Sequence, residues 1–160
     1  MRKLFLLILA LLIVGAILVS CDNSNKVDNY IFKSGSVEIV PGEDSAAVIS
    51  ALGEANSYDE EDIGCGNNEM AKVYNYGGFQ IKTYPDNSKD YIDIVTIKND
   101  SVSTPEGITI GSSRDDVISA YGEDYEAKGD GLIYKKDKTT LNIVIRNDAV
   151  TSIYYDYDFE

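Results

Sequence analysis

Apolar and polar residues alternate along six segments of the chain, and this alternation predicts β-strands. Leu141, Ile143 and Ile145 occupy every second position of one segment, which is typical of a strand with one buried face. Gly77-Gly78 predicts a tight hairpin between the first two segments. The six predicted strands are Ala71–Tyr76, Phe79–Tyr84, Tyr91–Lys98, Leu132–Lys136, Thr139–Arg146 and Ala149–Tyr157.

A helical pattern occurs twice, 69 residues apart. Residues 48–54 return as residues 117–123, and six of the seven residues are identical. In each copy, the apolar residues at i, i+3 and i+4 fall on one face of a short helix. Gly53 or Gly122 then ends that helix as a left-handed cap. A ligand-binding loop at the Gly-Glu pair is the alternative interpretation. We favour the helix stop, because glycine after a periodic segment is an ordinary stop signal.

The same order of elements is therefore expected twice. Asp44 and Ser113 are matching helix N-caps, and Ser113 begins a sequence close to a capping box. We predict an α+β fold of two tandem repeats, 36–100 and 107–160, each a helix followed by a three-stranded antiparallel meander, with 101–106 as the linker. One repeat is too small to hide its own sheet face, so we expect the two to pack together, one extended sheet being one arrangement.

The N-terminus carries the pattern of an export signal. A basic start precedes an apolar run from Leu4 to Val19, which is shorter than a membrane-spanning helix needs. The run ends in Leu18-Val19-Ser20-Cys21, which resembles a bacterial lipoprotein box. The resemblance implies that residues 1–20 are removed and that Cys21 carries acyl chains such as palmitate. We predict lipid anchoring to the cell membrane on its extracytoplasmic side, followed by a flexible tether over 21–35. An uncut N-terminal anchor is the alternative.

Composition excludes several function classes. The formal net charge is -13, and removal of Arg2 and Lys3 leaves 12 basic and 27 acidic residues, or -15. Such a chain repels phosphates, so we expect no nucleic-acid partner. The chain has no histidine, the usual general base and a common zinc ligand, and we predict neither a cofactor nor a metal. After acylation Cys65 is the one remaining thiol, and we interpret it as a small residue under a loop rather than a reactive group.

The predicted order of elements resembles the tandem β-lactamase-inhibitor-protein-like fold and its single-repeat relative, the SmpA/BamE group of envelope lipoproteins. The matching pattern is Ile110-Gly111-Ser112-Ser113, Val117 and Tyr121-Gly122-Glu123, with a late segment over 148–153. The chain also resembles uncharacterised lipoproteins of Firmicutes, especially clostridia, through residues 72–76 and 104–108. Known members bind proteins as inhibitors or assembly subunits, so the resemblance implies a protein-binding role.

Two candidate sites remain. The stretch Asp59-Glu60-Glu61-Asp62 offers oxygen ligands for Ca²⁺, but it lacks EF-hand spacing, and we interpret it as a solvated acidic loop. Alternation sends Tyr84 to the side opposite Phe79 and Ile81, so it is expected on the outer sheet face. Outer aromatic residues are typical of protein interfaces and also stabilise sheets through cross-strand pairs.

We therefore expect a membrane-anchored, non-enzymatic protein-binding lipoprotein, with an inhibitory or envelope-assembly role, that uses Tyr84 in its binding face. Its partners are the bilayer, through acylated Cys21, and an unidentified envelope or extracellular protein. A carbohydrate or cell-wall ligand at the same face is the alternative. A hydrolase built on two carboxylates is the third hypothesis and is disfavoured, because no acidic pair stands out from the general acidity.

Overall fold

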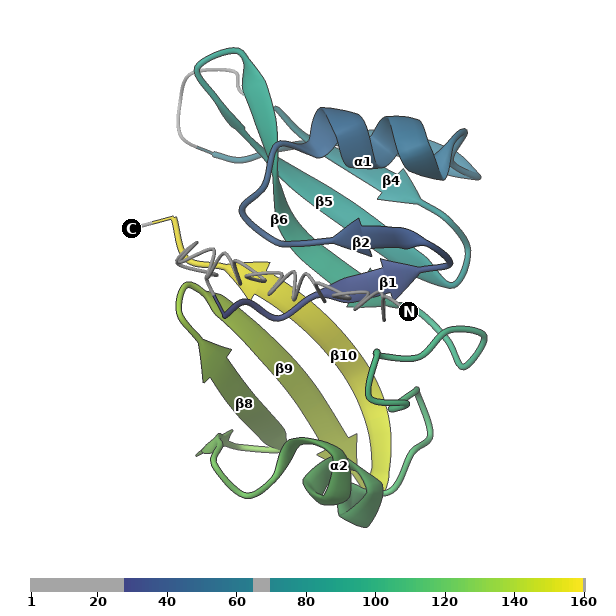
Figure 1. Ribbon diagram of the computed structural model, residues 1–160, viewed down its shortest axis with the longest axis vertical. Coiled ribbons are helices and arrows are strands. Elements are labelled where there is room, and N and C mark those ends of the chain that lie inside the picture. The colour runs from purple at the N-terminus through teal and green to yellow at the C-terminus, as the bar shows by residue number, and fades with distance from the viewer. Residues whose placement is uncertain (1–27, 65–69, 160) are drawn as a thin grey trace, which may run out of the picture.

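The computed structural model describes residues 28–64 and 70–159, and half of these are in β-strands and 13% in helices. Eight antiparallel strands form one sheet in the order β3-β4-β5-β6-β10-β9-β8-β7, and β1 and β2 form a separate hairpin (Figure 1). The strands are β1 (Phe32–Ser34), β2 (Val37–Ile39), β3 (Ser57–Asp62), β4 (Met70–Asn75), β5 (Phe79–Asp86), β6 (Lys89–Ile97), β7 (Glu126–Lys128), β8 (Gly131–Lys136), β9 (Thr139–Arg146) and β10 (Ala149–Tyr157). The helices are α1 (Ser45–Leu52) and α2 (Arg114–Tyr121).

The predicted fold class is wrong, although all six predicted strands are present. Each helix is followed by four strands, not three, and β6 pairs with β10 so that the two sets make a single, mostly β structure. The missed strands β3 and β7 are the two edges of the sheet, and their residues are exposed throughout. Exposed edge strands need no alternation of apolar residues, so the hydrophobic pattern carries no signal for them.

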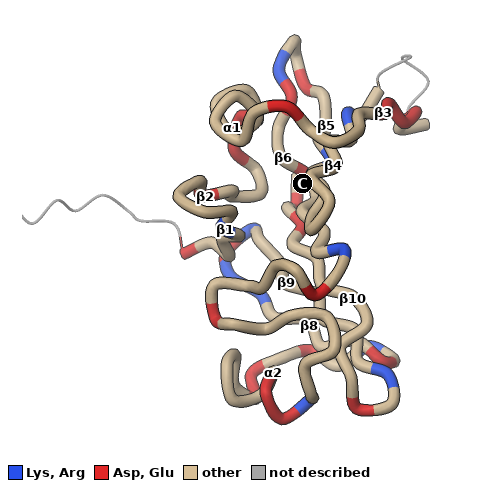
Figure 2. The backbone as a smooth tube through the Cα atoms, turned by 90° about the vertical axis from the view of Figure 1, so that its right-hand side faces the viewer, with Lys and Arg blue, Asp and Glu red and all other residues tan. Residues whose placement is uncertain are grey.

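The helices and the β1–β2 hairpin lie on one side of the sheet. Figure 2 shows α1, β1 and β2 to the left of the strands, and Figure 1 shows α2 in front of the ends of β9 and β10, so the opposite face of the sheet is not covered by them. We call the covered side the helix side and the other side the open face. No helix within residues 28–64 and 70–159 is long and apolar enough to cross a membrane.

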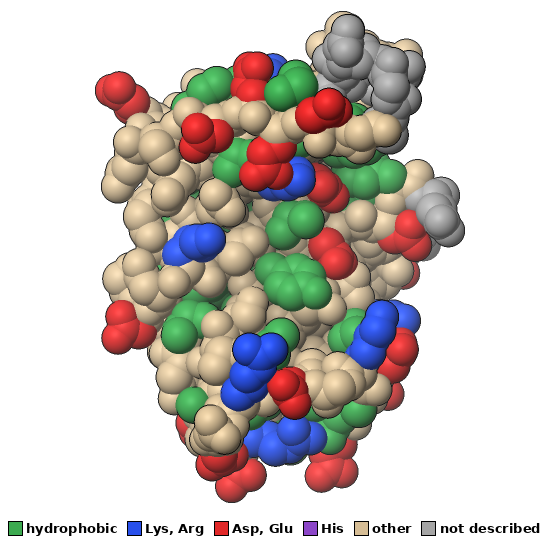
Figure 3. Space-filling view, turned by 180° about the vertical axis from the view of Figure 1, so that it is seen from behind, with side chains coloured by type: hydrophobic (Ala, Val, Ile, Leu, Met, Phe, Trp, Pro, Cys, Tyr) green, Lys and Arg blue, Asp and Glu red, His purple; other side chains and the backbone are tan. Residues whose placement is uncertain are grey.

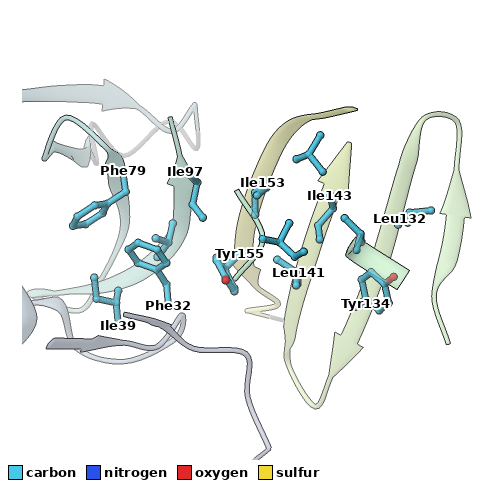
Figure 4. Packing of buried hydrophobic residues seen from close by; sticks show 14 of the residues in the cluster. Phe32, Ile39, Phe79, Ile97, Leu132, Tyr134, Leu141, Ile143, Ile153 and Tyr155 are labelled. Carbon is cyan, nitrogen blue, oxygen red and sulfur yellow. The ribbon is translucent and has the colours of Figure 1, made fainter. Parts of the chain in front are cut away.

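One hydrophobic core joins the two halves of the sheet. Phe32 of β1 is fully buried, and its ring centroid lies 5.0 Å from that of Phe79 on β5 and 6.0 Å from that of Tyr155 on β10 (Figure 4). Phe32 and its neighbours fall within the segment 21–35 that was predicted to be a tether. That prediction is wrong for β1, because Tyr30-Ile31-Phe32 is too short a run to show a period, yet Phe32 fills the junction of the halves.

Both helix caps form as predicted. The Asp44 carboxylate accepts a hydrogen bond from the Ala46 N–H, and Ser113 forms a reciprocal capping box with Asp116. Gly53 and Gly122 end the helices with positive φ angles of 77° and 82°. The interpretation of the repeated Gly as a helix stop is confirmed.

The backbone before each helix pairs with the last strand of its own half. The Gly42 N–H donates to the Ile92 carbonyl at 2.7 Å, and the Gly111 N–H donates to the Val150 carbonyl at 2.8 Å. In each case the strand residue returns a hydrogen bond to the residue after the glycine, at 2.9 and 2.8 Å. These bonds fix where each helix begins over the sheet.

Candidate binding face

On β5, β6 and β10, the open face consists of the side chains that alternate with those of the core. Along β5, Phe79, Ile81 and Thr83 are buried, whereas Lys82 and Tyr84 are partly exposed. The predicted position of Tyr84, opposite Phe79 and Ile81, is the one observed. The central strands contribute to the open face Gln80, Lys82, Tyr84, Ile94, Thr96, Asn142, Tyr154 and Asp156. Figure 3 shows apolar side chains in the middle of this face among acidic and basic ones.

An aromatic cluster at one end of the sheet joins Tyr84 of the open face to Tyr157, which falls on the same side of β10 as the buried Tyr155. The Tyr84 ring stacks on Phe159 with centroids 5.0 Å apart, and Phe159 contacts Tyr157 edge-on at 4.8 Å. Phe159 remains 40% exposed, so the cluster presents an apolar aromatic surface to solvent. The sequence pattern gave no signal for Phe159, because it follows the last strand.

A shallow polar hollow of about 520 Å³ lies on the open face of the second half. Its lining includes Asn142, Val144, Arg146, Tyr154 and Asp156. The Asp156 carboxylate accepts hydrogen bonds from the Thr140 hydroxyl and, at 3.3 Å, from the Asn142 amide. These bonds hold the carboxylate beside the Tyr154 ring. Alternation along β10 predicts the Tyr154 ring and the Asp156 carboxylate on this face, but the sequence analysis singled out only Tyr84.

Asp93 lies near the centre of the same face, at the bulge of β6. Burial raises the pKa of its carboxyl group, the nearby Lys82 ammonium opposes that rise, and Asp156 adds to it. Asp93 is not part of the hollow lining. The Asp93 carboxylate therefore carries a desolvation cost at neutral pH that the surrounding charges only partly offset.

The acidic stretch over 59–62 is not a loop. It belongs to the edge strand β3, because it pairs residue by residue with β4. Two of its carboxylates have side-chain partners: Glu60 accepts from the Tyr58 hydroxyl at 2.6 Å, and Glu61 pairs with Lys82 at 2.8 Å. The bond to Glu60 is the main reason that the pKa of Tyr58 is raised to about 12. Within the described ranges, no group of three His, Cys, Asp or Glu residues is arranged to hold a metal ion.

Two predicted residues lie outside the described ranges. Cys21 and Cys65 fall within 1–27 and 65–69, so their predicted roles stay predictions.

Comparison of the chain with protein-family models, with curated proteins and with solved structures found no match. The functional argument therefore depends on the residues of the open face alone.

Proposed function

We propose that this chain is a membrane-anchored, extracytoplasmic lipoprotein that binds another protein through its open face, without catalysis. The observation that supports the proposal is the composition of that face. Partly exposed Tyr84, Ile94, Tyr154 and Phe159 lie among charged side chains. Apolar and aromatic residues inside a polar rim are typical of protein interfaces.

The expected partner has a basic surface. The chain beyond residue 20 has 12 basic and 27 acidic residues, so its overall field attracts cationic proteins and repels anionic ones. Lys82 and Arg146 on the open face both engage carboxylates of this chain, with Nζ–Oε2 and Nε–Oδ2 distances of 2.8 and 3.1 Å. The cations of the face are therefore partly neutralised locally, and the net field remains acidic.

Co-purification with matched variants tests the proposal. Residues 22–160, which include every described residue, would be incubated with solubilised envelope and culture supernatant of the source organism. We expect one stoichiometric protein whose capture is lost with Tyr84→Ala and Tyr154→Ala. The matched control is Tyr58→Ala, since Tyr58 is 48% exposed but belongs to the edge strand β3.

Salt provides the second readout. Capture of a basic partner should weaken as ionic strength rises, because screening shortens the range of the acidic field. If no protein is captured, or if Tyr58→Ala abolishes capture as completely as the open-face variants, the proposal is wrong.

The hollow favours a carbohydrate as the second candidate ligand. The Tyr154 ring, the Asn142 amide and the Asp156 carboxylate line one space, and together they offer a stacking surface and hydrogen-bonding groups for a sugar. Calorimetric titration with soluble cell-wall fragments tests this alternative. It requires binding that is lost with Tyr154→Ala and retained with Tyr58→Ala.

A further inference from the structure

The first described residues are fastened to the second half of the sheet. The Asp28 N–H donates to the Asp137 carboxylate at 3.0 Å, and the Lys136 ammonium pairs with the Asp28 carboxylate at 3.2 Å. The Tyr30 N–H donates to the Thr139 hydroxyl at 2.8 Å. The chain preceding β1 is therefore held at the turn between β8 and β9, which lies about 110 residues later in the sequence.

These contacts fix the side from which the chain enters the domain. Tyr30 packs against Tyr121 of α2 with ring centroids 6.3 Å apart, and Phe32 then enters the core beneath the hairpin. Figure 2 shows the first described segment, which leads into β1, at the far left, with the strands of the sheet to its right. The point of entry is thus opposite the open face.

The length of chain before Asp28 limits how the domain can turn. Six residues separate Asp28 from Cys21, so the seven intervening steps reach at most about 25 Å when fully extended. The helix layer and the sheet together are roughly 20 Å thick. Cys21 and its lipid could lie on the side of the open face only if the segment before Asp28 used almost all of its length to pass around the domain.

The densest group of basic residues lies beside the entry point. Lys135, Lys136 and Lys138 fall within four consecutive positions, in a chain that is otherwise acidic. Their side chains interact within the chain, for example in the ion pair of Lys135 with Glu126 at 2.8 Å. Lys135 lies opposite Thr140 on the open face, whereas Lys136 pairs with Asp28 on the helix side. Glu126, Asp28 and Asp137 offset the charges of the three Lys residues, so the turn adds no net acidic charge to the repulsion between the domain and a membrane.

We propose that the helix side, with the β8–β9 turn, is the surface that faces the membrane, and that the open face is held away from the bilayer. The inference rests on the proposed anchoring at Cys21 and on the proposed use of the open face. In this orientation the bilayer does not cover Tyr84, Tyr154 or the hollow. A partner approaching from outside the cell membrane meets them directly.

The absence of tryptophan from the chain makes the orientation measurable. Full-length lipoprotein, purified with its lipid, would be reconstituted into phosphatidylcholine–phosphatidylglycerol vesicles that carry a headgroup-attached energy acceptor. Ala47→Trp labels the exposed side of α1, and Thr96→Trp labels the open face. Ser119→Trp and Gln80→Trp provide a second label on each side in case the first variants misfold.

We expect energy transfer to the bilayer to be at least about two-fold higher from the helix-side labels than from the open-face labels. The reason is that about 10 Å separates the helix layer from the sheet. Equal transfer, or greater transfer from the open-face labels, would overturn the orientation. Flotation of the vesicles distinguishes a failure of the proposed anchoring from a failure of the proposed orientation. Failure of the full-length protein to float with the vesicles overturns the anchoring and the orientation together, whereas flotation with equal transfer overturns the orientation alone.

Discussion

The two halves of the sheet share a backbone scheme but give it different side-chain surroundings. Gly42 and Gly111 occupy matching positions before α1 and α2, with φ angles of 91° and 94°, and make the same pair of strand hydrogen bonds. A side chain on Gly42 would meet the Tyr157 ring, which lies 2.3 Å from the position of its Cβ. No atom lies within 4 Å at Gly111. One backbone geometry, repeated in the two halves, thus has two different packing requirements.

The bulges of β6 and β10, the last strands of the two halves, also match in backbone and differ in side chain. Asp93 is the extra residue of the β6 bulge, and Thr151 is the extra residue of the β10 bulge. The first is a half-buried carboxylate, and the second is an exposed hydroxyl that donates to the Val144 carbonyl. A position can therefore be equivalent in the hydrogen-bond pattern and still differ in its electrostatic cost.

The largest expected effect comes from the residue that joins the halves. Phe32→Ala should lower the free energy of unfolding by about 3–5 kcal/mol, because it empties a fully buried site between Phe79 and Tyr155. Urea denaturation measures the change, with Tyr58→Ala as the exposed aromatic control. Similar losses in the two variants would show that β1 does not hold the halves together.

A pair of glycine substitutions sharpens the comparison. Gly111→Ala should cost about 1 kcal/mol, from backbone strain at positive φ alone. Gly42→Ala should cost about 3 kcal/mol, since the new Cβ must also displace the Tyr157 ring. Thermal unfolding compares the two variants. Equal costs would mean that the ring moves aside freely and that the halves do not differ here.

The smallest effect has the opposite sign and depends on pH. Asp93 binds its proton more tightly in the folded protein, because burial raises its pKa above the ordinary 3.8. Its contribution to stability therefore falls as the pH rises from about 4 through the folded pKa. Asp93→Asn should raise the unfolding midpoint at pH 7 and leave it unchanged below about pH 4. A destabilised variant at pH 7 would show that the carboxylate is well paired, as Thr151 is.

The sequence predicted the elements with periodic patterns and missed those without them. The strands β9 and β10 have the bounds that their alternation predicted, and Gly53 and Gly122 end the helices as expected. The edges β3 and β7 were missed because exposed strands are defined by their pairing partners. The β6–β10 pairing forms the single extended sheet that was one expected arrangement, but it joins segments about 60 residues apart and leaves no local trace that specifies it.

The candidate site was predictable to a similar extent. The position of Tyr84 followed from alternation, but its stacking on Phe159 did not, because Phe159 lies beyond the last strand. The hollow beside Tyr154 depends on residues of the four neighbouring strands β7, β8, β9 and β10 together. A single strand read alone shows which side a residue takes, but not what it shares that side with.

The acidic edge strand β3 has a consequence for crowding. The sheet does not close on itself, so a second copy could extend it by pairing along an exposed edge, which is the usual route to aggregation. On this protein, pairing of β3 with the β3 of a second copy would bring two rows of four carboxylates, residues 59–62 of each copy, against one another. Under the proposed anchoring at Cys21, copies would share one bilayer and collide often, and like charges on their edges would repel. The strand that completes the sheet thus also keeps neighbouring molecules apart.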